Sequence, residues 1–327
     1  MENRILFSIL TPTHNRKDFL PKLIESLENQ ECKDFEWIIA DDGSDDGTFE
    51  YLKNKIKNIS FSTLAIKSDI RIGKSKIDNL LIDHAVGENI IWCDSDDYFE
   101  KDALSYIKSK LSQRNKDNAF IGVIGQNLDT EGKSQTFKRK KNLPDDGIYS
   151  WEFLENVLDG DGTISIPTSL FGNIRFPEID FVCHEGILLK KIFKNKRFFF
   201  TKKVLKIMNR SAENSVTHGK KIEYARGSFF AMSQTLNKKD FYKLKFIERL
   251  FKATNFFRYA LHGDVKIKEA MSILSKKSIN PSYFLCLAPA LMLVLRDNLT
   301  KKVTKTHIEF DKNIQNFKIS TLRNNAS

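Results

Sequence analysis

Short apolar runs alternate with amphipathic stretches along the first hundred residues. Four runs rich in β-branched or aromatic residues are typical of buried strands, at 5–10, 37–40, 61–66 and 90–93. The stretches between them repeat apolar residues at helical spacing, which predicts helices around 19–27, 51–56 and 75–85. Strands and helices that alternate with short links favour a mostly parallel α/β sheet with right-handed crossovers.

The pattern changes in the rest of the chain. A helix at 101–111 and a strand at 119–126 are expected first, followed by a polar, hairpin-like region to 141. Residues 151–192 combine a short helix, a glycine-rich loop and a further helix. From residue 220 onward the pattern is helical, basic and rich in phenylalanine. We therefore predict two domains, 1–218 and 219–327.

Acidic residues follow two of the predicted strands directly. Asp41 and Asp42 end the second strand, and Asp94, Asp96 and Asp97 follow the fourth. Ligands of open parallel sheets bind beyond the carboxyl ends of the strands, so these two clusters are expected at one edge. Three carboxylates within four residues repel one another, and a bound Mg²⁺ or Mn²⁺ that also holds phosphate would relieve this repulsion. An acidic turn that binds nothing is the alternative.

Composition and charge narrow the class of protein. The 327 residues are 41% hydrophobic and 29% charged, as in soluble globular proteins, and the net charge of +11 indicates an anionic partner. The four cysteines form no Cys-x-x-Cys pair and no signal peptide is recognisable at 1–4, so we expect reduced thiols in a cytoplasmic protein. The longest apolar run, Tyr283 to Leu295, is too short to span a bilayer.

Three familiar ligand motifs are incomplete in this sequence. Residues 42–47 resemble the start of an EF-hand loop, but Lys53 stands where the bidentate glutamate is needed. The tripeptide at 73–75 resembles the end of a P-loop, but Ser68 replaces the required glycine. No Gly-x-Gly-x-x-Gly follows the first strand, which argues against an ordinary nicotinamide or flavin site.

Three other motifs follow one another along the first hundred residues. They are Ser-Ile-Leu-Thr-Pro-Thr-His-Asn-Arg at 8–16, Ile-Ala-Asp-Asp-Gly-Ser-Asp-Asp-Gly-Thr at 39–48, and Ala-Val-Gly-Glu at 85–88 leading to Asp-Ser-Asp-Asp at 94–97. Together they resemble family 2 glycosyltransferases with the GT-A fold. The resemblance covers about the first hundred residues. It implies a GT-A catalytic domain with a helical C-terminal extension. It also implies metal-dependent, inverting transfer of a sugar from a UDP-sugar to a hydroxyl of a glycan or lipid-linked glycan.

The resemblance assigns residues to the nucleotide. In the family, the acid after the second strand hydrogen-bonds uracil, which by position is Asp42, with Asp41 as its neighbour. The loop at 12–16 packs on the nucleotide, and His14 stands where the family often has an aromatic residue. The nucleotide-binding residues implied in this way are Pro12, Thr13, His14, Asn15, Arg16, Asp41, Asp42, Gly73, Lys74, Asn79, Asp94 and Ser95.

The family's Asp-x-Asp motif corresponds to Asp94 and Asp96, with Asp97 beside it. The resemblance implies that these acids hold Mn²⁺ or Mg²⁺ against the diphosphate, where the metal acts as a Lewis acid for the leaving nucleotide. It also implies that the loop at 210–218 closes over the diphosphate, with His218 as a metal ligand or phosphate contact. The Gln-x-x-Arg-Trp signature of processive members is absent, so transfer of a single sugar is expected.

The catalytic base falls where this sequence departs from the family. A Glu-Asp pair usually opens a helix about ninety residues after the metal motif, and here His184 and Glu185 occupy that place. The resemblance implies that Glu185 takes the proton of the acceptor hydroxyl, with Asp180 as the fallback. An acid at a helix start is also favoured by the helix dipole alone, and this structural explanation stays open.

The C-terminal region lies outside the motifs and leaves two explanations open. Basic and aromatic residues interleave at Lys238, Lys239, Phe241, Lys243, Lys245, Phe246, Arg249, Leu250, Phe251, Lys252, Phe256, Phe257 and Arg258. This pattern fits peripheral contact with an anionic membrane surface, on the inner face if the protein is cytoplasmic. It also fits an amphipathic helix that packs on the catalytic domain with a solvated basic face. Nothing resembles a nucleic-acid recognition module, so we expect no nucleic-acid partner.

Two rival functions remain for the chain as a whole. The departure at His184 and Glu185 also fits a nucleotide-sugar-binding protein that has lost catalysis. A nucleotidyltransferase shares the α/β architecture and the acidic metal site, but it would release pyrophosphate rather than UDP.

Overall fold

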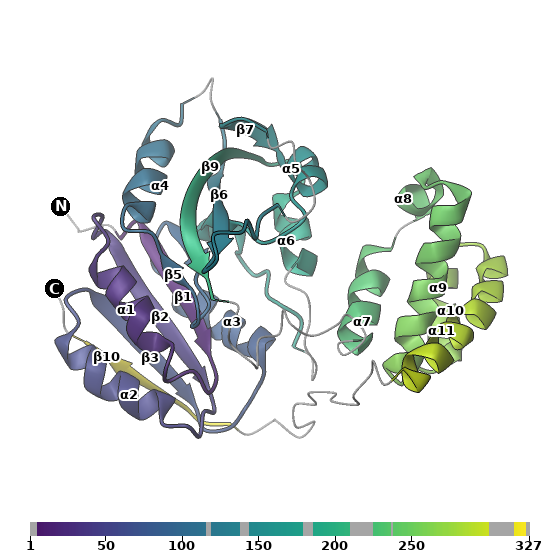
Figure 1. Ribbon diagram of the computed structural model, residues 1–327, viewed down its shortest axis with the longest axis horizontal. Coiled ribbons are helices and arrows are strands. Elements are labelled where there is room, and N and C mark those ends of the chain that lie inside the picture. The colour runs from purple at the N-terminus through teal and green to yellow at the C-terminus, as the bar shows by residue number, and fades with distance from the viewer. Residues whose placement is uncertain are drawn as a thin grey trace. The chain divides into compact units, whose positions relative to one another are not determined.

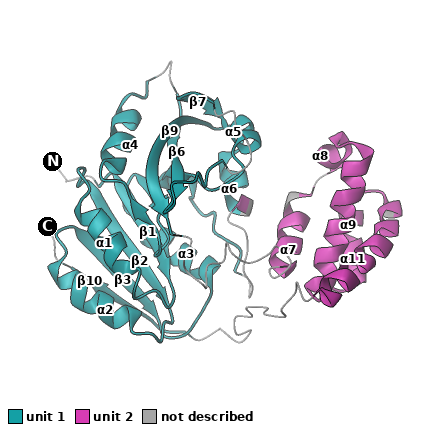
Figure 2. Cartoon of the chain, in the orientation of Figure 1, with its two compact units in different colours: residues 1–178, 188–213, 313–327 teal, residues 179–187, 214–312 magenta. Residues whose placement is uncertain are grey.

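The computed structural model describes residues 5–115, 119–137, 144–178, 186–209, 225–236, 238–300 and 317–324. The chain divides into two compact units (Figure 2). The first, here the sheet unit, comprises 1–178, 188–213 and 313–327. The second, here the helical unit, comprises 179–187 and 214–312.

The first half of the sheet unit is parallel, as predicted (Figure 1). Its strands lie in the order β3-β2-β1-β4, with bounds Ser62–Ser68, Phe35–Asp42, Phe7–Thr13 and Asn89–Trp92. The helices and 3₁₀ helix that connect them are α1 (Leu20–Glu28), α2 (Thr48–Lys55), η1 (Ile56–Asn58) and α3 (Lys74–His84). This arrangement brings the carboxyl ends of β1, β2 and β4 to one edge.

The second half of the sheet is mixed, so the expectation of a mostly parallel sheet holds only for the first half. Its strands are β5 (Tyr98–Phe99), β6 (Gly122–Asp129), β7 (Gly147–Ser150), β8 (Thr163–Pro167) and β9 (Arg197–Met208). Strand β8 pairs antiparallel with both β4 and β6, and β9 pairs antiparallel with β5 and β7. Among the described strands of this half, only β6 and β9 run parallel. The remaining helices are α4 (Ala103–Ser112), α5 (Trp151–Val157), η2 (Thr168–Leu170) and α6 (Gly186–Phe193).

A last strand, β10 (Ile319–Arg323), pairs antiparallel with β3. The Asn324 side chain accepts the Thr63 N–H (2.8 Å) and donates to the Phe61 carbonyl (2.8 Å), which fastens the strand at its end. The C-terminal stretch therefore belongs to the sheet unit, although the sequence pattern around it predicted no strand.

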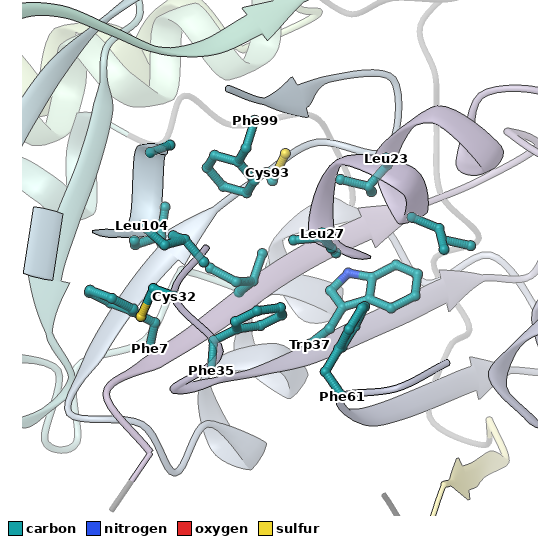
Figure 3. Packing of buried hydrophobic residues seen from close by; sticks show 14 of the residues in the cluster. Phe7, Leu23, Leu27, Cys32, Phe35, Trp37, Phe61, Cys93, Phe99 and Leu104 are labelled. Atoms are coloured by element: carbon teal, nitrogen blue, oxygen red, sulfur yellow. The ribbon is translucent and has the colours of Figure 1, made fainter. Parts of the chain in front are cut away.

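Both faces of the sheet are buried, which explains the continuous apolar runs of its strands. Ile9 and Trp37 point into the core cluster on one face, and Leu10 and Ile38 into the cluster on the other. Figure 3 shows the first cluster, where Leu23 and Leu27 of α1 lie over Trp37. Burying each of these side chains stabilises the fold by about 1.5–3 kcal/mol.

The helical unit contains α7 (Ala225–Thr235), α8 (Lys238–Lys243), α9 (Phe246–His262), α10 (Ile267–Lys276), η4 (Pro281–Cys286) and α11 (Leu287–Leu299). Its buried core includes Phe241, Phe256 and Phe257, three of the aromatic residues that the sequence pattern had grouped with the basic ones. Buried Asp297 of α11 accepts hydrogen bonds from Arg258 (2.8 Å) and lies 3.2 Å from His262, which joins α11 to α9.

The described cysteines are buried free thiols, at Cys32, Cys93 and Cys286. Cys183 lies outside the described residues. Reduced thiols in a cytoplasmic protein stay a prediction.

Candidate active site

The loops after β1 and β2 form one platform at the carboxyl edge of the sheet. The Asn15 N–H donates to Ser44 Oγ (2.8 Å), and Asn15 exchanges two further hydrogen bonds with Asp45 (2.8 and 3.0 Å). The Arg16 N–H donates to Thr48 Oγ1 (3.1 Å). Asn15 adopts a φ of 52°, a conformation that asparagine tolerates better than most residues. The two motifs at 8–16 and 39–48 are therefore held together as a single surface.

Asp42 anchors the segment that leads into α3. Its carboxylate accepts the backbone N–H groups of Ile72 (2.6 Å) and Gly73 (3.1 Å), while His14 Nδ1 lies 2.8 Å from the Asp42 carbonyl. Burial raises the pKa of Asp42, and the hydrogen bonds from Ile72 and Gly73 oppose this rise. Both carboxylate oxygens are thus engaged by the protein backbone, which gives Asp42 a structural contact besides the uracil contact implied for it.

Gly43 makes this anchoring possible. A Cβ atom at Gly43 would lie 2.4 Å from the Ile70 carbonyl carbon and 2.6 Å from the Arg71 nitrogen, and its φ is +64°. Only glycine allows the two backbones to approach so closely at this conformation. The glycine of the second motif therefore allows the backbone of the 70–73 segment to lie against the loop after β2.

Asp41 and Thr13 contain buried polar atoms that lack a partner among the described residues. They occupy paired positions on β2 and β1. Asp41 Oδ1 accepts the Ser44 hydroxyl, whereas Asp41 Oδ2 and Thr13 Oγ1 have no hydrogen bond. Burial raises the pKa of Asp41 to about 6. Unsatisfied buried polar atoms are rare in folded proteins. They mark this end of β1 and β2 as a place where a polar ligand that reached them would gain hydrogen bonds.

The metal motif forms a tight turn directly after β4. The Asp97 N–H donates to the Asp94 carbonyl (3.0 Å). The Asp94 side chain is 46% exposed and that of Asp96 is 14% exposed. Burial and the negative charge of Asp94 raise the pKa of Asp96. Arg16 Nη2 lies 3.9 Å from Asp96 and Lys74 Nζ lies 3.9 Å from Asp94, both beyond hydrogen-bonding distance.

The donor set of this turn fits a divalent cation that is shared with phosphate. Among the described residues, no three His, Cys, Asp or Glu side chains are grouped to hold a metal on their own. Mg²⁺ at phosphate sites needs only one or two carboxylates, because substrate phosphates and waters supply the other ligands. Asp94 and Asp96 repel each other, and their described cationic neighbours lie 3.9 Å away, so a cation between them would further lower the energy of the turn.

Asp97 has a different environment from the other two acids. It is buried, its Oδ2 lies 2.8 Å from Lys206 Nζ on β9, and its Oδ1 accepts the Asn209 N–H (3.2 Å). Burial raises the pKa of Asp97 to about 6 against the opposing charge of Lys206. Burial lowers the pKa of Lys206, but the charge of Asp97 outweighs it and raises the value. This buried ion pair fixes the metal turn to the second half of the sheet, and metal binding by Asp97 stays a prediction.

The remaining predicted nucleotide residues lie on α3 and in the metal turn. Gly73 precedes the helix with a φ of 93°, and Lys74 Nζ pairs with Asp78 (3.0 Å). Asn79 exchanges hydrogen bonds with the backbone of Phe176 (2.7 and 3.0 Å), so its amide joins α3 to a distant segment. Ser95 is buried.

The predicted base, its fallback and neighbour, and the predicted metal ligand of the 210–218 loop cannot be placed in the same way. Asp180, His184, Glu185 and His218 lie outside the described residues. Helix α6 is described from Gly186 onward. Their roles stay predictions.

Sequence reasoning missed Lys206, whose ion pair with Asp97 belongs to the site. This ion pair leads to a testable prediction. Lys206→Met should leave the Asp97 charge buried without its partner and lower the free energy of unfolding by about 3–5 kcal/mol. The loss should shrink as the pH is lowered and Asp97 becomes protonated, and Asp97→Asn added to Lys206→Met should restore part of the stability. Urea unfolding of the three variants measures these differences.

The matched control is Lys203→Met on the same strand. Lys203 Nζ pairs with Asp102 (2.7 Å), but both side chains are partly exposed, so the change should cost no more than about 1 kcal/mol. Equal losses for Lys203→Met and Lys206→Met would contradict the structural importance of the buried pair.

Comparison with known proteins places these features in a family. Residues 8–177 match the family model Glycosyl transferase family 2. The chain is 31% identical over 214 residues to the GalNAc(5)-diNAcBac-PP-undecaprenol beta-1,3-glucosyltransferase of Campylobacter jejuni, covering 65% of this chain and 67% of that protein. It is 31% identical over 126 residues to the poly(ribitol-phosphate) beta-N-acetylglucosaminyltransferase TarS of Staphylococcus aureus, covering 37% of this chain but only 21% of TarS.

Solved structures support the same fold. The S. aureus TarS 1–349 complex with UDP-GlcNAc aligns with a TM-score of 0.57 at 16% identity, covering 94% of this chain and 97% of that one. A mannosyltransferase from Pyrobaculum calidifontis, solved with GDP-Man and Mn²⁺, aligns with a TM-score of 0.52 at 15% identity, covering 92% and 84%. The family match over more than half of the chain agrees with the mixed α/β sheet and the acidic turn after β4. The chain belongs to glycosyl transferase family 2 and is a glycosyltransferase of GT-A-like fold.

Proposed function

We propose that the protein transfers a single sugar from a UDP-sugar to a hydroxyl of a glycan or lipid-linked glycan, with inversion at the anomeric carbon and with Mn²⁺ or Mg²⁺. The observation that carries this proposal is the pair Asp94 and Asp96. The two acids stand at the carboxyl edge of the sheet with no cation closer than 3.9 Å in the described structure, beside the platform formed by the loops after β1 and β2.

The relatives support the donor and acceptor classes. The C. jejuni relative is named for an undecaprenol diphosphate-linked acceptor, and the TarS structure contains UDP-GlcNAc. The P. calidifontis structure contains GDP-Man and Mn²⁺, so the fold alone does not select uridine over guanosine. We favour UDP because two sequence relatives are a glucosyltransferase and an N-acetylglucosaminyltransferase.

Different residues of the chain would bind different parts of the donor. The loop at 12–16, with Asp41 and Asp42, would hold the nucleoside. Asp94 and Asp96 would hold the cation, which when bound stabilises the charge of the leaving diphosphate. Arg16 and Lys74 lie beside these acids and carry charges that complement phosphate oxygens.

Glu185 is our candidate for the base. An inverting transfer needs a carboxylate that accepts the proton of the acceptor hydroxyl as its oxygen attacks the anomeric carbon from the face opposite the diphosphate. Membership of a glycosyltransferase family disfavours a nucleotidyltransferase. It leaves a catalytically inactive sugar-nucleotide binder as the rival to be tested.

The donor and metal assignments can be tested together. Purified protein is incubated with UDP-glucose, UDP-GlcNAc and GDP-mannose in Mn²⁺, and nucleoside diphosphate release is measured with and without a glycan acceptor. We expect UDP release that EDTA abolishes. Asp96→Asn should reduce the rate at least about a thousandfold, or roughly 4 kcal/mol of transition-state stabilisation, because the ligand charge is lost.

Glu100→Gln is the control for Asp96→Asn. It removes an exposed carboxylate four residues away whose side chain has no part in the turn, so activity should be unchanged. Full activity in excess EDTA or in Asp96→Asn would refute the metal assignment, and release of GDP alone would refute the uridine donor.

Glu185 makes a separate prediction. Glu185→Gln keeps the size of the side chain and removes the proton acceptor, so transfer should collapse while the affinity for UDP-sugar changes little. Calorimetric titration of donor and a transfer assay distinguish these effects. An active Glu185→Gln enzyme together with an inactive Asp180→Asn enzyme would move the role to Asp180.

A further inference from the structure

The helical unit has an exposed apolar stripe along α11. Ala290 and Asp297, seven residues apart, are buried on the side that faces the unit's core. On the other side, Leu291, Met292, Leu295 and Leu299 are 44–85% exposed, and their spacing of three, four and seven residues places them on one face of α11. Phe284 and Leu285 of η4, which directly precedes α11, are 44% and 77% exposed and extend this stripe along the chain. An exposed, contiguous apolar face of this kind indicates an interaction site.

A second group of exposed apolar residues occupies the first turns of α9. Phe246, Ile247 and Phe251 are 61–70% exposed, although other aromatic residues of this helix are buried. The Tyr242 hydroxyl accepts the Asn280 N–H (3.0 Å), so the junction of α8 and α9 and the start of η4 meet at one end of the helical unit. We call the α11 stripe and these three α9 residues together the apolar surface.

The helical unit carries an excess of positive charge. Residues 225–300 contain 13 Lys or Arg and 5 Asp or Glu. Lys238, Lys239, Lys243 and Lys245 are exposed on α8 and at the start of α9, adjoining Phe246 and Ile247 in the chain. Exposed aromatic and aliphatic side chains flanked by lysines are the combination found on helices that lie in the interface of an anionic bilayer.

We propose that the apolar surface docks on an anionic lipid bilayer, with α11 and the start of α9 lying in the headgroup region. Acidic headgroups complement the excess of lysine and arginine, and each such residue near the surface strengthens binding. A second copy of this chain would instead oppose one positively charged unit to another. The charge of the unit therefore favours lipid over self-association.

Docking on the surface fits the structure better than spanning the bilayer. The segment Ser282–Leu299, 18 residues long, has the length and composition of a membrane span, so the apolar stretch is longer than the run Tyr283 to Leu295 seen in the sequence. However, buried Asp297 is held by Arg258 of α9 (2.6 Å), and taking α11 into lipid would break this pair or bring its charges into hydrocarbon.

This inference does not depend on the proposed transfer reaction, and its test measures no activity. The full chain is sedimented with vesicles of phosphatidylcholine alone and of phosphatidylcholine mixed with phosphatidylglycerol, at low and high salt. We expect binding to the mixed vesicles only, weakened by salt. Replacing Lys238, Lys239, Lys243 and Lys245 with glutamine should weaken it by about a hundredfold or more, since each lysine contributes about fivefold.

A variant of the apolar surface tests the second half of the proposal. Phe251→Gln, Met292→Gln and Leu295→Gln combined should abolish vesicle binding and leave the circular dichroism spectrum and melting temperature near wild type, because all three side chains are exposed. Val86→Gln with Phe153→Gln removes exposed apolar side chains from the sheet unit and should bind normally.

Three results would overturn the proposal. Equal binding to neutral vesicles would exclude the anionic requirement. A dimer in sedimentation velocity that the triple glutamine variant converts to monomer, without vesicle binding, would assign the surface to a second copy. Resistance to alkaline carbonate extraction from native membranes would indicate that α11 spans the bilayer.

Discussion

The parallel pairing of β1 with β2 on one side and β4 on the other is the constraint on which the candidate site depends. It sets Thr13 opposite Asp41 and brings the acidic turn after β4 to the same edge of the sheet. Both faces of these strands are buried, so a shift in register would place apolar side chains wrongly on two sides at once. The positions of the acidic loops are therefore determined by the core.

Electrostatics then gives neighbouring acids different roles. Asp97 is compensated by Lys206 at 2.8 Å, and Asp42 by backbone N–H groups, so both serve to hold loops in place. Asp94 and Asp96 have cationic neighbours only at 3.9 Å. The same residue type thus provides the anchors Asp42 and Asp97 and the less compensated pair Asp94 and Asp96, for which we propose cation binding.

The sequence predicted the elements that can be recognised from residues adjacent in the chain. The first strands were recognisable because they are buried on both faces, and the acidic clusters because they directly follow those strands. Lys206 was missed because its partner Asp97 is distant in the chain, and because Lys202, Lys203 and Lys206 interrupt the apolar run of β9. Likewise, periodicity showed that Phe256 and Phe251 lie on helices, but only packing shows that the first is core and the second exposed.

The central claim is that Asp94 and Asp96 form a cation site that a nucleoside diphosphate completes. Titration of the protein with Mn²⁺, followed by electron paramagnetic resonance with and without UDP, tests it most directly. The account predicts weak Mn²⁺ binding by the protein alone and binding about tenfold tighter or more when UDP is present, because the diphosphate would complete the ligands of the cation. Mn²⁺ affinity that is the same with and without UDP, or that survives in the variant lacking both carboxylates, would contradict it.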